Sequence, residues 1–252
     1  MRTIAIIPAR YASTRFPAKP LAMLGDRMVI EWVYRTAERV FERVVVATDD
    51  VRIADAVVRF GGEAVMTSSE HRCGTERCAE ALEKIGGEWD IVVNIQGDEP
   101  FTTEEQLRTI VALFDTPTTD IATLATPLRG DSATADLHNP NVVKVAISQR
   151  STALYFSRSP IPHLRGIAPE EWTKHHTYLR HVGIYAFRSE VLRTVVTLEP
   201  TPLECAESLE QLRWLEMGYT IGVGITEDVG IGIDTPEDLR RADALIANRE
   251  LK

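Results

Sequence analysis

The sequence has few cysteines, and their spacing predicts neither a disulfide nor a zinc site. The cysteines are Cys73, Cys78 and Cys205, an odd number with no C-x-x-C pair. This pattern argues against a disulfide framework and against a structural zinc site. We therefore expect reduced cysteines and a cytoplasmic protein.

Long hydrophobic runs are also missing. No apolar run approaches the roughly 18–20 residues that span a bilayer. The apolar run at residues 4–7 leads directly into a basic segment and is too short for the core of a signal peptide. The sequence thus predicts no membrane partner and no targeting segment.

Positive charge is scarce overall. The chain has 28 Lys and Arg against 37 Asp and Glu, a net charge of -9. Such an acidic balance argues against broad nucleic-acid binding, which needs a basic stripe or face. We expect no nucleic-acid partner.

Both common nucleotide fingerprints are absent. The chain has no G-x-x-x-x-G-K-[ST] string, and no G-x-G-x-x-G opens a helix after the first predicted strand. The sequence therefore argues against a dinucleotide-dependent hydride transfer and against nucleotide hydrolysis by a P-loop enzyme.

The composition is that of an ordinary globular protein. The chain has 252 residues, 44% hydrophobic and 26% charged, which fits one large domain or a domain with an embedded subdomain. No linker or repeat divides it. We predict a single domain over residues 1–252, with an irregular excursion at about 150–190.

Strand-like and helix-like patterns alternate through the first half. Short apolar runs predict buried strands at 4–7, 44–47, 64–66 and 91–95. Amphipathic stretches predict helices at 28–40, 51–60, 75–85 and 103–114. This β-α repetition with short connections predicts an α/β fold with a doubly wound, mostly parallel sheet.

The second half is less regular. Its patterns predict strands at 121–125, 142–146, 184–187 and 219–225. They predict helices at 203–217 and from 235 onward, with Thr235 as N-cap and Pro236 in the first turn. A segment rich in Pro, His and Arg at 157–181 is expected to be an excursion, a lid or an oligomer contact.

A basic loop follows the first predicted strand. The first 25 residues contain no acidic residue and four cations, Arg2, Arg10, Arg15 and Lys19. Loops beyond the carboxyl end of a strand bind the ligands of α/β sheets. Guanidinium and ammonium groups there, beside Ser13 and Thr14, suit a polyphosphate. The alternative is a solvated basic loop.

Two acidic motifs complete the candidate site. Gln96-Gly97-Asp98-Glu99-Pro100 follows the strand at 91–95, where a carboxylate suits a Mg²⁺ ion that bridges phosphate oxygens. Asp234 follows a glycine-rich turn and could complete that metal site with Asp98. The alternatives are a polar turn or helix cap at Asp98, and helix-start chemistry for the residues after Asp234.

A further loop precedes the predicted helix at 75–85. In His71-Arg72-Cys73-Gly74-Thr75-Glu76-Arg77, the Cys73-Gly74 step is expected to present amides to a ligand, with Thr75 as the helix cap. Cys73 as a nucleophile is the weaker hypothesis, because no activating His–Asp set is evident.

Together these strings resemble the 3-deoxy-manno-octulosonate cytidylyltransferases, also called CMP-Kdo synthetases. The resemblance runs nearly end to end. The matching strings are P-A-R-Y-A-S-T-R-F-P-A-K-P-L at 8–21, V-A-T-D-D at 46–50, H-x-x-G-T-E-R at 71–77, Q-G-D-E-P at 96–100, N-P-N-V-V-K-V at 139–145, A-L-Y-F-S-R at 153–158, L-R-H-V-G-I-Y at 179–185, L-E-Q-L-R at 209–213 and G-I-D-T-P-E-D-L at 232–239.

The resemblance implies the transfer of CMP from CTP to 3-deoxy-D-manno-octulosonate (Kdo) for lipopolysaccharide biosynthesis, with Mg²⁺ as cofactor and pyrophosphate as the second product. It implies a nucleotide-diphospho-sugar transferase-like, Rossmann-like fold with a smaller mixed-strand subdomain for dimerisation and substrate binding. A homodimer is expected, with the irregular middle segment near its interface.

The resemblance also implies roles for individual residues. The catalytic residues are Arg10, Lys19, Asp98 and Asp234, of which the two aspartates bind the metal. The nucleotide is bound by Pro8, Ala9, Arg10, Ser13, Thr14, Arg15, Lys19, Arg72, Gly74, Gln96 and Gly97. The acidic keto-sugar is bound by Arg158, His181, Tyr185, Glu210 and Gln211, with Arg158 on its carboxylate.

Two departures from the family pattern bear on this assignment. The family usually has Ser where Cys73 stands, and the segment at 157–165 keeps only the family's outline. The alternatives are the same transfer to 8-amino-Kdo or another acidic sugar, such as sialic acid, and a CTP-binding module without turnover. Retention of Arg10, Lys19, Asp98 and Asp234 disfavours the module.

Overall fold

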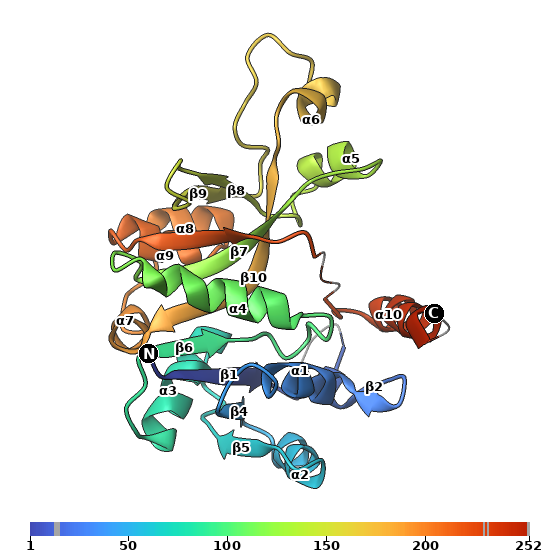
Figure 1. Cartoon of the computed structure of the whole chain (residues 1–252), viewed down its shortest axis with the longest axis vertical. Helices are drawn as coiled ribbons and strands as arrows, with labels where there is room; N and C mark the ends of the chain where they lie inside the picture. The colour runs from blue at the N-terminus through green and yellow to red at the C-terminus, as the bar shows by residue number, and fades with distance from the viewer. Residues whose placement is uncertain (13–15, 229, 231, 251–252) are drawn as a thin grey trace. The chain divides into compact units, whose positions relative to one another are not determined.

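The computed structural model describes residues 1–12, 16–228, 230 and 232–250, and the chain divides into two compact units (Figure 1). Unit 1 comprises Met1–Arg108, Arg188–Val196 and Gly230–Lys252, and unit 2 comprises Thr109–Phe187 and Thr197–Val229. Among the described residues, no helix is both long and apolar enough to span a membrane. The prediction of a single domain over 1–252 stays a prediction.

Unit 1 is built on a parallel sheet with the strand order β6–β1–β4–β5. Residues Ile4–Ile7 of β1 have no exposed surface. This is expected for an apolar strand that is covered on both faces of the sheet. The strands of unit 1 are β1 (Thr3–Ala9), the short β2 (Met23–Leu24) and β3 (Arg27–Met28), β4 (Val44–Thr48), β5 (Glu63–Met66) and β6 (Ile91–Asn94).

Helices follow these strands in the order that the sequence predicts. They bury one apolar face each, as Ile53, Ala56 and Val57 do on α2, which Asp50 caps by accepting from the Arg52 amide at 2.9 Å. The helices of unit 1 are η1 (Lys19–Leu21), α1 (Val29–Ala37), α2 (Val51–Arg59), α3 (Gly74–Ile85), α7 (Ser189–Val195) and α10 (Pro236–Glu250), and the division between the units falls inside α4 (Glu104–Ala112).

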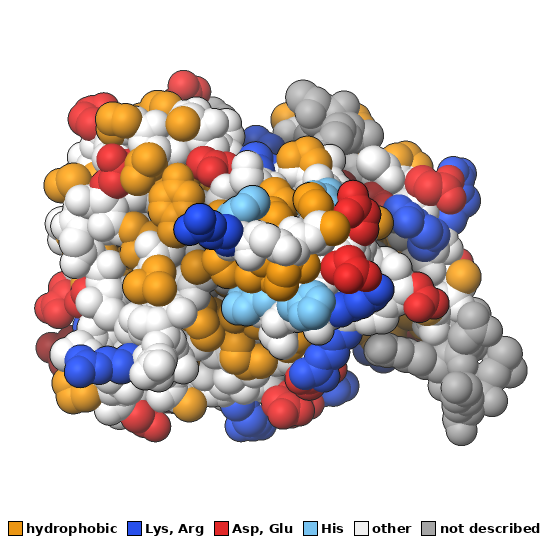
Figure 2. Space-filling model, turned by 90° about the horizontal axis from the view of Figure 1, so that it is seen from above, with side chains coloured by type: hydrophobic (Ala, Val, Ile, Leu, Met, Phe, Trp, Pro, Cys, Tyr) orange, Lys and Arg blue, Asp and Glu red, His pale blue; other side chains and the backbone are white. Residues whose placement is uncertain are grey.

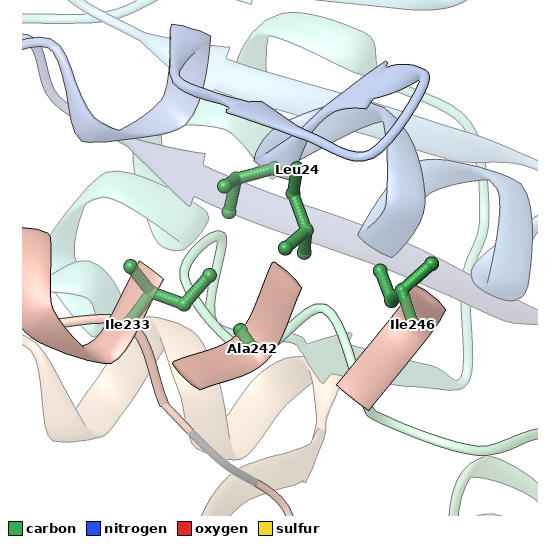
Figure 3. Close-up of a cluster of buried hydrophobic side chains, with 5 residues drawn as sticks. Leu24, Ile233, Ala242 and Ile246 are labelled. Carbon is green, nitrogen blue, oxygen red and sulfur yellow. The ribbon is translucent and has the colours of Figure 1, made fainter. Parts of the chain in front are cut away.

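A small apolar cluster fastens the C-terminal segment to the N-terminal hairpin within unit 1. Figure 3 shows Leu24 of β2 beside Ala242 and Ile246 of α10, with Ile233 completing the group. Leu24, Ile233 and Ala242 have no exposed surface. Burial of this cluster fixes the chain immediately before Asp234, and so sets where that carboxylate lies.

Unit 2 contains a mixed sheet. β7 lies between β11, which is parallel to it, and β10, which is antiparallel, while β8 pairs antiparallel with β10 and β9. The pairing of β10 with β7 shifts register between Val182 and Tyr185. The strands are β7 (Ile121–Pro127), β8 (Lys144–Ile147), β9 (Ala153–Ser157), β10 (Leu179–Arg188) and β11 (Ile221–Ile225).

The helix predicted at 203–217 is wrong. The structure has two short helices there, because Ser208 takes a left-handed backbone conformation with φ of 51° and ends the first of them. An uninterrupted helix cannot pass through that conformation. The helices of unit 2 are η2 (Leu113–Asp115), α5 (Ala133–His138), η3 (Pro169–Glu171), α6 (Trp172–His175), α8 (Pro202–Glu207) and α9 (Gln211–Glu216).

The excursion after β9 has a core of its own. Trp172 of α6 and Tyr178 are buried against Leu128, Ala133 and Leu137 from the α5 region. Figure 2 shows hydrophobic side chains and histidines gathered on one face of the molecule. The exposed histidines of the excursion are His163, His175 and His176. Its role as a lid or an oligomer contact stays a prediction.

The fold class predicted from the sequence is confirmed. Unit 1 contains the β-α alternation and the parallel strands that the first half of the sequence predicts. In the second half, the strand predicted at 184–187 is the end of the longer β10, and the strand predicted at 142–146 begins two residues later, as β8.

Candidate active site

A pocket of about 310 Å³ lies in unit 1 beyond the carboxyl ends of β1 and β6. Parallel strands end at one edge of a sheet, which is why loops distant in sequence meet there. Many of the residues predicted to bind nucleotide or metal line it, namely Pro8, Ala9, Arg10, Lys19, Arg72, Gly74, Gln96, Gly97, Asp98 and Asp234. The other predicted nucleotide residues, Ser13, Thr14 and Arg15, lie outside the described residues.

Lys19 stands between the two aspartates. Its ammonium nitrogen lies 2.5 Å from Asp98 Oδ2 and 3.2 Å from Asp234 Oδ1. The Lys19 side chain is only 11% exposed, whereas those of Asp98 and Asp234 are 32% and 48% exposed. The ammonium is therefore held inside the pocket wall by carboxylates that still face the pocket opening.

Backbone contacts hold these aspartates together. The amide of Ile233 donates to the carbonyl oxygen of Asp98 at 2.9 Å, so the chain around residue 234 is tied to the loop after β6. Thr235 and Asp238 then form a reciprocal cap: the Asp238 amide donates to Thr235 Oγ1 at 3.2 Å, and the Thr235 amide donates to Asp238 Oδ2 at 2.9 Å. The predicted N-cap role of Thr235 is confirmed.

Gly97 is required by close packing. A Cβ atom built on it would lie 2.9 Å from the carbonyl oxygen of Pro8 and 3.2 Å from Ile30 Cδ1. The Pro8 carbonyl belongs to β1, a strand that pairs with β4 on one side and with β6 on the other. The bare backbone at Gly97 therefore lets the loop that carries Asp98 lie directly against β1.

We expect Gly97→Ala to lower the free energy of unfolding by about 1–3 kcal/mol, the usual cost of overpacking. Urea denaturation is the measurement. The matched control is Gly232→Ala, because no atom among the described residues lies within 4 Å of a Cβ at that position. Equal stability of the two variants would show that the close approach to β1 imposes no constraint.

Arg77 is a pocket residue that the sequence reasoning did not single out. It is 4% exposed and donates to Thr67 Oγ1 at 2.6 Å, to the Ser68 carbonyl at 3.2 Å and to Asp49 Oδ2 at 3.1 Å. It thereby joins the loops after β4 and β5. The sequence signal that could have identified Arg77 was its place in the H-x-x-G-T-E-R string. Three further residues that were not assigned to the site also line the pocket, namely Pro20, His71 and Cys73.

The loop before α3 is fixed by acidic residues of that helix. Glu80 accepts from the Ser68 amide at 2.8 Å and pairs with His71 Nε2. Hydrogen bonding to Lys84, with further contributions from Ser68 and His71, lowers the pKa of Glu80 to about 2. Glu80 therefore stays ionised near neutral pH and keeps His71 at the pocket wall.

The predicted cap at Thr75 is wrong. The helix α3 begins at Gly74, so Cys73 occupies the N-cap position and Thr75 lies inside the first turn. An added Cβ at Gly74 would lie 3.1 Å from Pro8 Cγ, so glycine lets this helix start come close to β1. The helix N-terminus therefore faces the pocket, where its amides favour an anion.

The residues predicted to bind the sugar all belong to unit 2. Arg158 is held by backbone carbonyls: Nε donates to Glu207 O at 2.6 Å, Nη1 to Pro140 O at 3.0 Å and Nη2 to Ser208 O at 3.3 Å. A guanidinium has five N–H groups, so donors remain for a further partner. Its pairing with a sugar carboxylate stays a prediction.

Lys144 supports the same corner of unit 2. It has no exposed surface, and its ammonium donates to the carbonyls of Asn139, Val142 and Arg158 at 3.0, 2.6 and 2.5 Å. Burial lowers its pKa. The three carbonyls satisfy the ammonium and fix the backbone that carries Arg158.

His181 and Tyr185 lie together on β10. Their ring centroids are 5.4 Å apart, and Tyr185 is 8% exposed. Burial raises the pKa of Tyr185 well above its ordinary value, with the charge of Glu210 adding to the effect. Burial lowers the pKa of His181 to about 3, aided by Arg180. Near pH 7 both side chains are therefore neutral hydrogen-bonding groups.

Glu210 and Gln211 begin α9. Glu210 is the N-cap residue and Gln211 is the first helical residue, which is 5% exposed. The break at Ser208 places both at a helix start instead of in mid-helix, which the sequence pattern did not predict. The charge of Glu210 adds to the rise in the pKa of Tyr185 that burial causes.

The pKa of His181 predicts a change of stability with pH. In the unfolded chain the pKa lies near 6.5, whereas the folded value is about 3. The unfolded state therefore takes up the proton first, so the stabilisation is complete above about pH 6.5 and is lost as the pH falls toward about 3. We expect the free energy of unfolding to fall more steeply in that window than in His181→Gln; parallel urea-denaturation profiles would contradict this.

The two aspartates fit a magnesium ion only in part. In the part of the chain that the structure describes, no group of three or more His, Cys, Asp and Glu side chains is arranged to hold a metal. Asp98 and Asp234 nevertheless face one point, since both contact the same nitrogen. Mg²⁺ is commonly held by one or two carboxylates, with water and substrate phosphates as the other ligands. The residues present suit that arrangement.

Comparison with known proteins gives consistent similarities. A family profile described as "Cytidylyltransferase" matches residues 4–221. The 3-deoxy-manno-octulosonate cytidylyltransferase of Bacteroides thetaiotaomicron is 55% identical, with 99% of this chain and 100% of the relative covered. The enzyme of the same name from Parabacteroides distasonis is 54% identical, with 99% and 100% covered.

Solved structures are similar as well. A CMP:2-keto-3-deoxy-manno-octonic acid synthetase complexed with CTP superposes with a TM-score of 0.90 at 40% identity, covering 99% of this chain and 100% of the other. A 4-diphosphocytidyl-2C-methyl-D-erythritol synthase from Anaerococcus prevotii, at 17% identity, has a TM-score of 0.64 over 98% and 99% of the two chains, and shares the fold.

Proposed function

The chain belongs to the cytidylyltransferase family, among the 3-deoxy-manno-octulosonate cytidylyltransferases, and from this premise we propose that it transfers CMP from CTP to Kdo. The products are CMP-Kdo and pyrophosphate. The family resemblance stated from the sequence motifs is confirmed by the extent of identity. The protein is therefore a nucleotidyltransferase, and its substrates follow from its relatives.

One observation carries the proposal: a single pocket of unit 1 joins the cations of the N-terminal loop with two carboxylates distant in sequence. Arg10, Lys19, Asp98 and Asp234 all line it. The cations alone would suit any polyphosphate, and the carboxylates alone would suit a metal ion. Together they can bind both the phosphates and a metal ion that bridges them.

CTP binds in this pocket. Lys19, Arg10 and Arg15 neutralise the triphosphate, and Ser13, Thr14, Arg72 and Gly97 contribute further polar and backbone contacts. The close packing of Gly74 and Gly97 against Pro8 supports a narrow slot for the base. The residues that line the cytosine position are Pro8, Ala9, Gly74 and Gln96.

Asp98 and Asp234 would hold Mg²⁺. The support is that both carboxylates face one point and remain partly exposed. When bound, the ion supplies charge neutralisation for the phosphate oxygens and orients them. Because these two carboxylates alone provide few ligands, metal affinity should depend strongly on CTP.

The anomeric hydroxyl of Kdo attacks the α-phosphorus of CTP. The new bond joins that oxygen to phosphorus and the hydroxyl proton passes to solvent, while the bond to the bridging oxygen of the β-phosphate breaks and pyrophosphate leaves with the negative charge. Lys19 and Arg10 stabilise this charge as it develops. Such transfers need little covalent help from the protein, so positioning and electrostatics supply most of the rate enhancement.

Kdo binds through residues of unit 2. His181, Tyr185, Glu210 and Gln211 bind its hydroxyl groups, and Arg158 binds its carboxylate through the N–H groups not used on backbone carbonyls. The support is the buried Tyr185 hydroxyl, which has no hydrogen-bond partner among the described residues and so is available to a ligand.

The chain acts as a homodimer in the cytoplasm, in lipopolysaccharide biosynthesis. The face that carries apolar side chains and histidines in Figure 2 supports a subunit contact. Cys73, Cys78 and Cys205 form no disulfide in the described part of the chain, which is consistent with a reducing compartment. Sedimentation equilibrium tests the dimer.

The function is tested by pyrophosphate release. The purified chain is incubated with CTP, Mg²⁺ and, in separate reactions, Kdo, 8-amino-Kdo, sialic acid or no sugar, with an EDTA control for each. We expect release with Kdo that EDTA abolishes. Faster pyrophosphate release with another sugar would show that this sugar, and not Kdo, is the acceptor. CTP binding without release on any sugar would instead indicate the module without turnover.

A further inference from the structure

Thr123 lies buried in β7 beside the candidate sugar residues and has no assigned role. It has no exposed surface. Its hydroxyl oxygen lies 3.0 Å from His181 Nε2, 3.1 Å from the Val182 carbonyl and 2.8 Å from the Ile184 carbonyl. These partners come from β10, where its pairing with β7 shifts register and turns two carbonyls toward one side chain.

The single hydroxyl hydrogen of Thr123 decides which ring nitrogen of His181 is protonated. A threonine hydroxyl has one hydrogen to donate and two lone pairs. If it donated to Nε2, both carbonyl oxygens would face its lone pairs at 3.1 Å or less without a hydrogen between them. If Nε2 carries the hydrogen, Thr123 accepts from it and donates to the Ile184 carbonyl. The second arrangement leaves one carbonyl, that of Val182, facing a lone pair, whereas the first leaves two, so the second is favoured.

The other ring nitrogen, Nδ1, is then an acceptor. A neutral imidazole has one N–H, so a hydrogen on Nε2 leaves a lone pair on Nδ1. Nδ1 has no hydrogen-bond partner within the described part of the chain. The ring is held in place edge-to-face against Phe156, with centroids 5.1 Å apart.

Tyr185 supplies the complementary group. Its hydroxyl is buried without a partner among the described residues, and it keeps its proton near neutral pH. His181 and Tyr185 therefore offer one acceptor and one donor on neighbouring rings. A sugar hydroxyl both donates and accepts, so it matches this pair better than a group that only donates or only accepts.

We propose that Thr123 is a positioning residue of the sugar site, which fixes His181 in the Nε2–H tautomer so that Nδ1 accepts a hydrogen bond from a hydroxyl of the acidic sugar. The assignment rests on the proposed function. Thr123 does not touch the sugar: it acts through the imidazole.

The test combines NMR with kinetics. Long-range ¹H–¹⁵N spectra of the ligand-free protein labelled at histidine, with His181→Gln to assign the signal, report which nitrogen carries the hydrogen. We expect the Nε2–H form in the wild type and a mixture of tautomers in Thr123→Val, which keeps the shape but not the hydroxyl. Thr123→Ser keeps the hydroxyl and should restore the wild-type spectrum.

The kinetic effect should be specific to the sugar. We expect KM for Kdo to rise about tenfold in Thr123→Val, the scale of one lost hydrogen bond, with KM for CTP unchanged and Thr123→Ser near wild type. An Nδ1–H tautomer in the wild type overturns the proposal, even if Thr123→Val does not fold. So does a Thr123→Val enzyme with a normal KM for Kdo, or with equal rises for both substrates.

A failure of the proposed function can be distinguished from a failure of the role proposed for Thr123. If the wild type shows no turnover with Kdo but does with another acidic sugar, the named substrate is wrong, and the tautomer measurement still stands because it needs no ligand. If Kdo turns over but the tautomer is Nδ1–H, the role of Thr123 alone is wrong.

Discussion

Asp98→Asn should lower kcat for CMP transfer by roughly 10²–10³-fold, the scale of losing one preorganised electrostatic group. The substitution keeps the shape of the side chain and removes its charge. Asp98 lies 2.5 Å from Lys19 Nζ, and only Asp234 shares that ammonium with it in the described chain. With one carboxylate left, the site should hold Mg²⁺ too weakly to draw the two anionic substrates together.

The matched control for this variant is Asp55→Asn. Asp55 is an exposed aspartate on α2, in the same unit, and does not line the pocket. Both variants should unfold at wild-type denaturant concentrations, so that a rate difference reports the site and not the fold. An Asp98→Asn enzyme with near-normal kcat at saturating Mg²⁺ would remove Asp98 from the metal role.

Lys19→Met should have an effect of similar size on transfer and a second effect on the resting protein. Transfer slows because the leaving pyrophosphate loses a buried cation. The free energy of unfolding falls by about 1–3 kcal/mol, because Asp98 and Asp234 lose their charged hydrogen-bond donor and repel each other. Added Mg²⁺ should then raise the melting temperature of the variant more than that of the wild type.

Thermal unfolding with and without Mg²⁺, alongside pyrophosphate release, measures both effects. Lys174→Met is the control, since Lys174 is exposed and pairs only with Glu171 in the described structure. Unchanged kcat and unchanged KM for CTP in Lys19→Met would refute the assigned role. An equal response of both proteins to Mg²⁺ would show that Lys19 does not compete with a cation at the two aspartates.

The first half of the fold was predictable because its strands are covered on both faces. Continuous apolar runs such as Ile4–Ile7 have few alternatives to a buried parallel strand, and each is followed by an amphipathic helix. The strands and helices predicted in unit 1 lie within a few residues of their observed positions, whereas β2, β3 and α7 were not predicted. The rule that parallel strands end at one edge then places the basic loop and Asp98 together.

The second half depends on interactions that periodicity does not contain. The apolar spacing over 203–217 continues past Ser208, yet a left-handed residue there ends one helix and starts another. Propensity gives no warning of such a break, because tertiary context overrides it. The cap at Thr75 was misplaced by two residues, because Gly74 is already the first residue of the helix and Cys73 is its N-cap.

The sequence predicted which residues form the site, but not how their side chains contact one another. Motifs identified Lys19, Asp98 and Asp234 separately, whereas the sharing of one ammonium by both carboxylates requires the cluster around Ile233 to fold. Thr123 was missed because it is a buried polar residue inside an otherwise apolar strand, and Arg77 because the sequence does not distinguish this buried charge from the other charged residues of α3. Their importance lies in the partners they hold, which only the tertiary structure reveals.

The central claim is that the pocket around Lys19, Asp98 and Asp234 directs attack on the α-phosphorus of CTP. Phosphorus NMR of CTP with Kdo, Mg²⁺ and the wild-type protein follows this most directly. We predict that the three CTP signals give way to pyrophosphate and a CMP ester, in equal amounts, only when Kdo is present. Cleavage to CDP and inorganic phosphate, or CTP left intact, would contradict the account.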